Sequence, residues 1–265
     1  MKQTGLVKSE GAELIYDTQG AGAPLILIPG AGGNSLVYAG LAEILAGEYT
    51  VITYDRRCNG RSSGDSEVAL DMAQQARDVL AVLQDAKQEH ALVFGNSGGA
   101  NIALKLASDH ADRVSCLVVH EPPVISLLPD APELIAFMNQ VHETFVEQGV
   151  PAAMQLFARR MVGFSGPVAG GLGDRKDLVH FFGKEYLNLT SFVPELAGIK
   201  EARIPVAVLV GALSDGAYYA RAATIVAERL GCPCITVPGN HLAFLIEPEP
   251  FALALRDTLS RLQAA

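Results

Sequence analysis

Short apolar runs recur along the chain, and segments with helical periodicity separate them. The apolar runs lie at 25–28, 50–54, 91–94, 116–119, 206–210 and 235–237. Continuous apolar runs of this length are typical of strands buried on both faces, as in a parallel sheet covered by helices. Apolar residues three and four positions apart predict helices at 36–45, 70–83, 100–107, 218–230 and 251–262.

The alternation of strand and helix predicts an α/β fold with a doubly wound, mostly parallel sheet. An opening hairpin is expected at 6–16, around Glu10-Gly11. No strand pattern occurs within 122–203, where we expect helices at 133–148, 152–161 and 178–187 and a glycine-rich connector at 163–173. We therefore expect a core made of 1–121 and 204–265, with a helical cap, 122–203, inserted over one end of the sheet.

Composition and charge narrow the class of protein. The chain has 265 residues, of which 49% are hydrophobic and 18% charged, so it can bury a large core and global disorder is disfavoured. A formal net charge of −9 argues against general binding to nucleic acid or anionic membranes. No apolar stretch approaches the ~20 residues of a membrane span, and the polar N-terminal segment does not resemble a signal peptide. A cytoplasmic protein is expected.

The most informative segment is a buried strand followed by Gly95-Asn96-Ser97-Gly98-Gly99 and then a helix. A serine on so tight a turn has a strained backbone, so the positions around it must lack bulk, and Gly95 and Gly99 meet that need. The helix that follows directs its first amides and the positive end of its dipole at a reacting carbonyl oxygen. Ser97 is therefore a predicted nucleophile, and the Gly98 amide a predicted oxyanion donor.

From this motif onward the chain resembles the α/β-hydrolase family along nearly its whole length. The segment 28–33 is similar to the family's oxyanion loop, which more often reads His-Gly-x-x-Gly. Pro29 replaces the histidine, but the role rests on a backbone amide, which we assign to Ala31. The segment 54–62 resembles the family's Asp-x-Arg-Gly-x-Gly-x-Ser loop, with Cys58 where glycine is usual. We expect this second loop to brace turns below the site.

A serine hydroxyl needs a base within hydrogen-bond reach, and the base needs a partner that fixes its tautomer. His241 follows the last expected strand, and the order serine, acid, histidine is the one this fold uses, so His241 is the predicted base. The family's commonest acid position falls on Ser214, one residue before Asp215. Glu121 stands where the zearalenone-type lactonases, which this arrangement resembles, have a glutamate. Because a one-residue slip should redirect a short side chain, we favour Glu121 and keep Asp215 as the alternative.

The resemblance implies a serine hydrolase that cleaves a carboxylic ester or lactone through an acyl-enzyme, without a metal or organic cofactor. Its expected partner is a small, hydrophobic substrate. Gly30 and Asn96 beside the motifs, and Phe181 and Phe182 in the aromatic-rich insertion, are the expected substrate contacts. A serine at position 97 argues against the dehalogenase and epoxide-hydrolase branches, which resemble this fold but use aspartate.

Two other functions remain open from the sequence. A C–C bond hydrolase or a lyase on the same scaffold would keep the same serine and histidine. A slow-turnover ligand receptor would not need an intact set of serine, histidine and acid. A homodimer also stays open, because no sequence feature fixes the oligomeric state.

Overall fold

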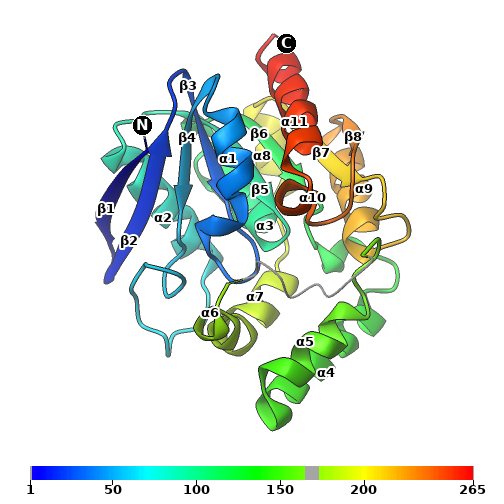
Figure 1. Ribbon diagram of the computed structural model, residues 1–265. Helices are drawn as coiled ribbons and strands as arrows, with labels where there is room; N and C mark the ends of the chain where they lie inside the picture. Colours follow the sequence, from blue (N-terminus) through cyan, green and yellow to red (C-terminus); the bar gives the residue numbers. More distant parts are fainter. Residues whose placement is uncertain (1, 165–172, 265) are drawn as a thin grey trace.

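A computed structural model describes residues 2–164 and 173–264 of the chain (Figure 1). In these residues eight strands form one sheet in the order β1-β2-β4-β3-β5-β6-β7-β8. The strands are β1 (Gln3–Ser9), β2 (Ala12–Gln19), β3 (Ala23–Ile28), β4 (Tyr49–Tyr54), β5 (Ala91–Asn96), β6 (Val114–His120), β7 (Val206–Gly211) and β8 (Cys234–Val237). Strands β1 and β2 form the expected antiparallel hairpin, and β2 also pairs antiparallel with β4. The remaining pairings, which join β4, β3, β5, β6, β7 and β8 in that order, are parallel. The prediction of a doubly wound, mostly parallel sheet is confirmed.

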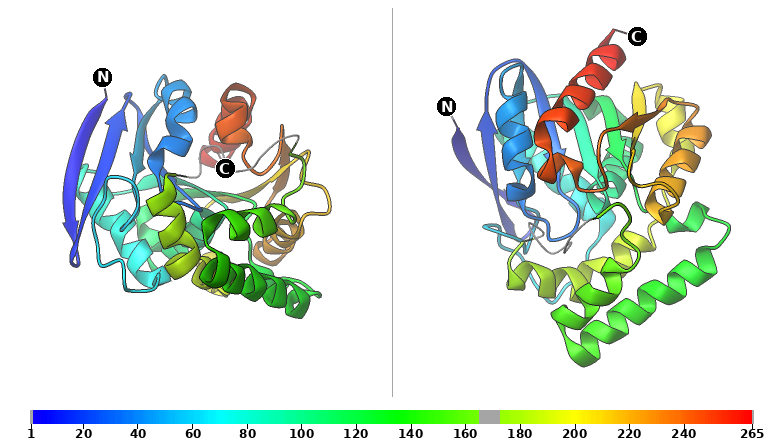
Figure 2. Two further views of the ribbon diagram at one scale, coloured as in Figure 1. Left: turned by 60° about the horizontal axis from the view of Figure 1, so that its bottom comes forward. Right: turned by 45° about the vertical axis from the view of Figure 1, so that its right-hand side comes forward.

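Helices cover both faces of the sheet (Figure 2). The helices outside the interval between β6 and β7 are α1 (Ala39–Leu45), α2 (Met72–Asp85), α3 (Gly98–Asp109), α9 (Tyr218–Leu230), α10 (Ala243–Ile246) and α11 (Pro248–Gln263). On one face α1 packs against α11, and on the other α2 packs against α3. The apolar runs of β3 to β7 therefore lie in strands covered on both sides, whereas the short run in the edge strand β8 is partly exposed.

The described residues between β6 and β7 are helical and contain no strand. They form α4 (Ala131–Gln148), α5 (Val150–Ala158), α6 (Arg175–His180), the π-helix Phe181–Glu185, α7 (Tyr186–Thr190) and α8 (Leu196–Ala202). Helices α4 to α7 lie at the lower end of the molecule as drawn in Figure 1. Helix α8, which the sequence pattern did not indicate, packs against α3 and α9 of the core layer. Most of the expected glycine-rich connector, 165–172, lies outside the described residues.

The register of the central strands brings distant segments to one edge of the sheet. Asn96 at the end of β5 pairs with His120 at the end of β6, and His120 pairs with Leu209 near the end of β7. Parallel strands end on the same edge, so the residues that follow β5, β6 and β7 must lie close together. Ser97 and Glu121 are the residues that follow the first two of these strands.

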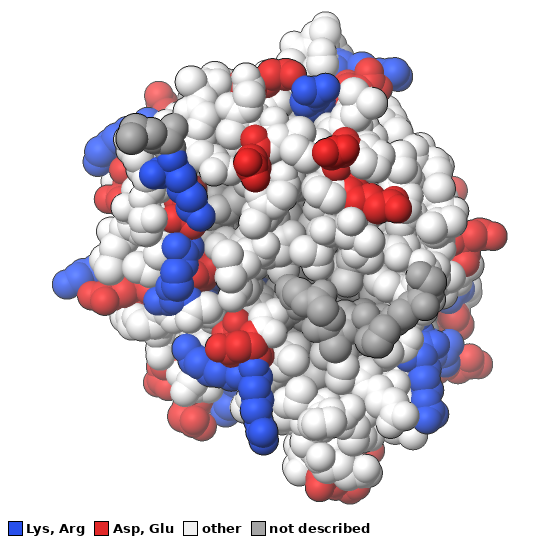
Figure 3. All heavy atoms as spheres, in the orientation of Figure 1, with Lys and Arg blue, Asp and Glu red and all other residues white. Residues whose placement is uncertain are grey.

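Charged side chains of both signs are interspersed on the face shown in Figure 3, mostly toward its margins. The centre of this face carries few charges. Across residues 2–164 and 173–264, no helix is both long enough and apolar enough to cross a bilayer.

A pair of leucine substitutions tests how far stability depends on the buried sheet. Leu117 in β6 has 0% exposure, whereas Leu253 in α11 is 61% exposed. Leu117→Ala should lower the free energy of unfolding by about 2–5 kcal/mol, because it removes buried contacts and leaves a cavity. Leu253→Ala should change it by less than about 0.5 kcal/mol. Urea denaturation measures both, and equal losses would contradict the assigned burial.

Candidate active site

Ser97 occupies a strained turn between β5 and α3. Its backbone has φ 54° and ψ −127°, a combination that residues with a side chain rarely adopt. The Ser97 N–H donates to the carbonyl of His120 at 3.0 Å, and the Ser97 carbonyl accepts from Ala100 N at 2.9 Å, where α3 begins. The turn is thus fixed by the neighbouring strand on one side and by the helix on the other, and conformational strain of this kind clusters at functional sites.

The glycines around Ser97 are required by backbone contacts. A Cβ atom at Gly95 would lie 2.4 Å from the carbonyl oxygen of Gly99, and one at Gly99 would lie 2.1 Å from that of Ile28. A Cβ at Gly30 would lie 2.8 Å from the carbonyl oxygen of Asn96 and 3.0 Å from the Cβ of Ser97. The oxyanion-type loop that begins at Gly30 can therefore approach the serine turn only because these positions carry no side chain.

The structure places Glu121, rather than Asp215, against His241. The Glu121 Oε2 atom lies 2.6 Å from His241 Nδ1, and Oε1 accepts a hydrogen bond from the Gly211 N–H at 2.8 Å. Glu121 is fully buried and His241 is 5% exposed. Asp215 is exposed, and in the described parts of the chain it forms no hydrogen bond or ion pair with His241. The geometry therefore favours Glu121 as the residue that orients the histidine.

The Glu121 carboxyl is ionised in this setting. Burial acts to raise its pKa, but the nearby His120 and the hydrogen bond from His241 outweigh burial and hold the pKa well below its ordinary value. An ionised Glu121 that accepts from Nδ1 fixes His241 in the tautomer whose Nε2 can take up a proton. Glu121 has a positive φ of 49°, so its position also depends on an unusual backbone conformation.

Two further residues, Tyr219 and His120, pack around this pair. The ring of Tyr219 lies 4.2 Å from the ring of His241, centroid to centroid, and its hydroxyl accepts from the Val162 N–H at 2.9 Å. The ring of His120 is fully buried and lies 6.1 Å from that of His241 in a stacked arrangement. The sequence reasoning missed Tyr219, the second residue of α9, whose only signal was its place a few positions after Asp215.

Asn96 ties the two histidines together. Its Nδ2 donates to the carbonyl oxygen of His241 at 3.1 Å and lies 3.2 Å from His120 Nδ1. Because an amide nitrogen donates, His120 Nδ1 accepts, and the ring proton of a neutral His120 is on Nε2. Asn96, expected as a substrate contact, lines the pocket of Ser97 but also holds the loop that carries the predicted base.

One pocket joins most of the predicted site residues. Ser97, His241, Gly30, Ala31 and Asn96 all line it. The other described residues of its wall are apolar: Val37, Phe157, Met161, Leu242 and Phe244. In the described residues no group of three or more His, Cys, Asp or Glu side chains is placed to hold a metal ion.

Phe181 and Phe182 do not reach this pocket. They are 4% and 1% exposed and pack in an aromatic cluster with Phe157 and Tyr186. Aromatic side chains at helical spacing mostly fill the interior, and Phe181 and Phe182 do so here instead of making the expected contact with substrate. Of the described residues of the insertion, Phe157 and Met161 line the pocket of Ser97.

His120 gives the site a distinctive dependence of stability on pH. Burial lowers its pKa from 6.5 to about 4. Between these two pH values His120 is mostly protonated in the unfolded chain and mostly neutral in the folded protein. The free energy of unfolding should fall by about 3 kcal/mol from this group as the pH drops from about 6.5 to about 4. His120→Asn should remove that part of the slope, as measured by urea denaturation across this range. Parallel curves for the two proteins would contradict the assignment.

The same fold is found in solved structures of other proteins. The structure is similar to a thermophilic esterase from Thermogutta terrifontis, with a TM-score of 0.79 and 20% identity over 98% of this chain and 99% of the other. It is also similar to the enol-lactonase from Burkholderia xenovorans LB400, with a TM-score of 0.73 and 17% identity over 97% of this chain and 100% of the other. At these identities the likeness concerns the fold.

A relative is found by sequence as well. The uncharacterized hydrolase YraK of Bacillus subtilis strain 168 is 25% identical over 273 aligned residues, which cover 97% of this chain and 96% of that protein. The family model described as alpha/beta hydrolase fold matches residues 23–167, more than half of the chain. Together with the parallel sheet and the strained serine turn, this match shows that the chain belongs to the α/β-hydrolase fold family.

Proposed function

We propose that the protein is a serine hydrolase that cleaves a carboxylic ester or a lactone of a small, hydrophobic substrate through an acyl-enzyme. One observation carries the proposal: Ser97, on a strained turn, shares a pocket with His241, whose other ring nitrogen is bound to a buried, ionised Glu121. A pocket that only bound ligands would not need this arrangement. The catalytic acid is Glu121 in this proposal, and Asp215 has no part in it.

The reaction follows from the roles of these groups. Ser97 Oγ attacks the substrate carbonyl while His241 Nε2 accepts its proton, and Glu121 stabilises the imidazolium that forms. The Ala31 and Gly98 amides hold the developing oxyanion, each contributing about 3 kcal/mol. His241 then protonates the leaving alkoxide, and the bond between the carbonyl carbon and that oxygen breaks. Water, deprotonated by His241, then attacks the acyl carbon, and His241 returns the proton to Ser97 Oγ as the bond between the acyl carbon and Oγ breaks.

The substrate class rests on the walls of the pocket and on the relatives. Among the described residues of the wall, the five other side chains are apolar and supply no charged group to bind an ionic substrate. The structural neighbours include an esterase and an enol-lactonase, which supports oxygen esters, open or cyclic. A lactone would leave its alkoxide on the acyl group, so a single hydroxy acid would be the product. We propose Phe157 and Met161 as the residues of the helical cap that contact substrate.

Covalent labelling tests the nucleophile without knowledge of the substrate. Incubation with a small fluorophosphonate should add one phosphonyl group per chain to the wild type, because an activated serine displaces fluoride from phosphorus. Ser97→Ala should gain none, and intact-mass measurement reads both. No adduct on a folded wild type would contradict the proposal and favour a ligand receptor.

Paired substitutions test the acid. Glu121→Gln should lower kcat on an aryl ester by about 10⁴-fold, because the amide no longer fixes the tautomer of His241. Asp215→Asn is the matched control and should leave kcat within about threefold of the wild type, as expected of an exposed residue outside the triad. A larger loss for Asp215→Asn than for Glu121→Gln would overturn the assignment. Thermal melting of both variants shows whether either loss reflects unfolding.

A further inference from the structure

Arg56 is a fully buried cation that contacts the oxyanion-type loop from behind. It lies two residues beyond β4 and is 0% exposed. Its Nε donates to the Pro29 carbonyl oxygen at 3.1 Å, and its Nη2 donates to the Gly30 carbonyl oxygen at 2.9 Å. Arg56 therefore binds two consecutive carbonyl groups of this loop, and the residue that follows them is Ala31.

The contact with Gly30 controls the predicted oxyanion donor directly. The Gly30 carbonyl and the Ala31 N–H belong to one peptide group, and in a trans peptide they point in opposite directions. A cation bound to the carbonyl therefore turns the N–H away from itself. Ala31 lines the Ser97 pocket, whereas Arg56 does not. The same cation withdraws charge through the amide and makes its N–H a stronger donor.

The counter-charge comes from the helical insertion. Glu185, in the last position of the π-helix Phe181–Glu185, is 1% exposed and binds Arg56 through both oxygens, at 2.7 and 2.6 Å. The Asn59 Nδ2 donates to the same carboxylate at 2.9 Å. Burial alone would lower the pKa of Arg56, but Glu185 raises it, so the guanidinium stays charged. π-helical turns are uncommon and occur frequently at functional sites.

A second buried carboxylate of the insertion holds the same two loops. Asp177 in α6 is 1% exposed, accepts from the Gly60 N–H at 2.8 Å and lies 3.3 Å from Asn34 Nδ2. Asn34 follows the oxyanion-type loop, and Gly60 lies in the loop of Arg56. The segment 174–185 therefore holds both loops through the carboxylates of Asp177 and Glu185, behind the pocket of Ser97.

We propose that Arg56 is a positioning residue that orients and polarises the Gly30–Ala31 peptide toward the oxyanion, and that Glu185 of the insertion holds Arg56 in place. This inference rests on the proposed function. A buried ion pair is often no more stabilising than well-packed apolar residues of the same size, so stability alone is a weak reason to keep one here.

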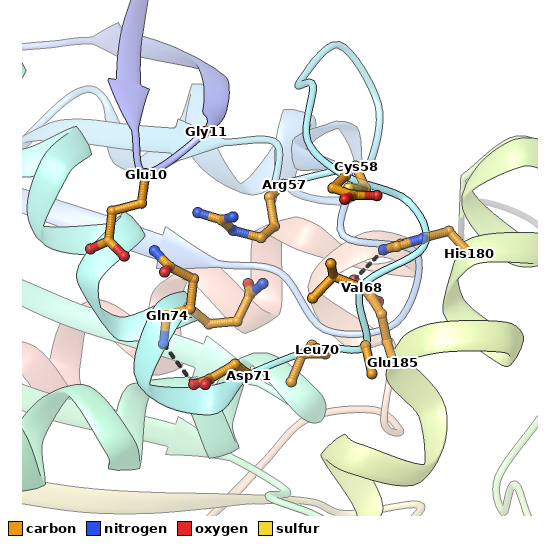
Figure 4. Close-up of a pocket in the computed structure, with 13 residues that line it drawn as sticks. Glu10, Gly11, Arg57, Cys58, Val68, Leu70, Asp71, Gln74, His180 and Glu185 are labelled. Atoms are coloured by element: carbon orange, nitrogen blue, oxygen red, sulfur yellow. Dashed lines mark hydrogen bonds and ion pairs between the residues drawn. The ribbon is translucent and has the colours of Figure 1, made fainter.

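The pair can be altered without changing the wall of the Ser97 pocket. Glu185 lines a different cavity, of about 320 Å³, together with Arg57 and His180 (Figure 4). Neither Ser97 nor His241 lines that cavity. Arg57 provides a matched control there, because it forms its own ion pair with buried Asp78 at 2.6 Å and, in the described residues, its side chain forms no hydrogen bond with the oxyanion-type loop.

The test compares two charge-neutral double variants, Arg56→Gln/Glu185→Gln and Arg57→Gln/Asp78→Asn, with the wild type. Each variant removes one ion pair and leaves no buried charge from that pair unpaired. Two inhibitors separate orientation of the donor from ordinary binding. A trifluoromethyl ketone is attacked by Ser97 Oγ and forms a hemiketal oxyanion, whereas the matching secondary alcohol cannot be attacked. The rate of fluorophosphonate labelling and the thermal midpoint are measured in parallel.

In the Arg56/Glu185 variant, the affinity for the trifluoromethyl ketone and the rate of fluorophosphonate labelling should each fall by about 10- to 100-fold. The affinity for the alcohol should change by less than about threefold. The Arg57/Asp78 variant should match the wild type in all three. Equal losses for ketone and alcohol, equal losses in both variants, or no loss for the Arg56/Glu185 variant would each overturn the inference. An unlabelled, folded wild type would instead contradict the proposed function itself.

Discussion

The site depends on a close approach of backbone segments that leaves no room for side chains. A Cβ atom at Gly99 would lie 2.1 Å from the carbonyl oxygen of Ile28, and one at Gly95 would lie 2.4 Å from that of Gly99. This contact lets β3, β5 and α3 converge, and the convergence holds Ser97 at φ 54°. The surrounding structure thus supports a conformation that costs about 1–3 kcal/mol in isolation. The direction of the serine, and so the place of the pocket, follows from it.

Buried polar groups then fix the histidine that faces this serine. Glu121, His120 and Asn96 come from the ends of neighbouring strands, and each has a polar atom that contacts His241 or the next member of the group. In a low-dielectric interior such contacts are strong when satisfied and costly when broken. His120 is neutral because burial lowers its pKa to about 4. Near neutral pH the ionised Glu121 therefore has His241 as its hydrogen-bonded side-chain partner, and the charge of His120 favours the Glu121 carboxylate only in the acid range, where the His120 ring is protonated.

The sequence predicted those features that local patterns determine. Buried parallel strands are marked by continuous apolar runs, and all six runs fall in β3 to β8. The serine turn can be recognised in the sequence because the tight backbone contacts around it require glycines at nearby positions. The contacts of the insertion could not be read in this way, because Arg56 and Glu185 are 129 positions apart. For the same reason Phe181 and Phe182 looked like pocket residues, although packing with Tyr186 turns them inward.

The choice between Glu121 and Asp215 shows where the limit lies. Both residues follow strands that end on the same edge of the sheet, so topology alone allowed either to reach His241. The difference is made by the side-chain direction, which depends on a positive φ at Glu121 and on the Gly211 N–H that donates to its second oxygen. No periodic pattern encodes a single positive φ at a residue other than glycine. A local backbone conformation of this kind, maintained by the next strand, decides which carboxylate is buried against the histidine and which remains in solvent.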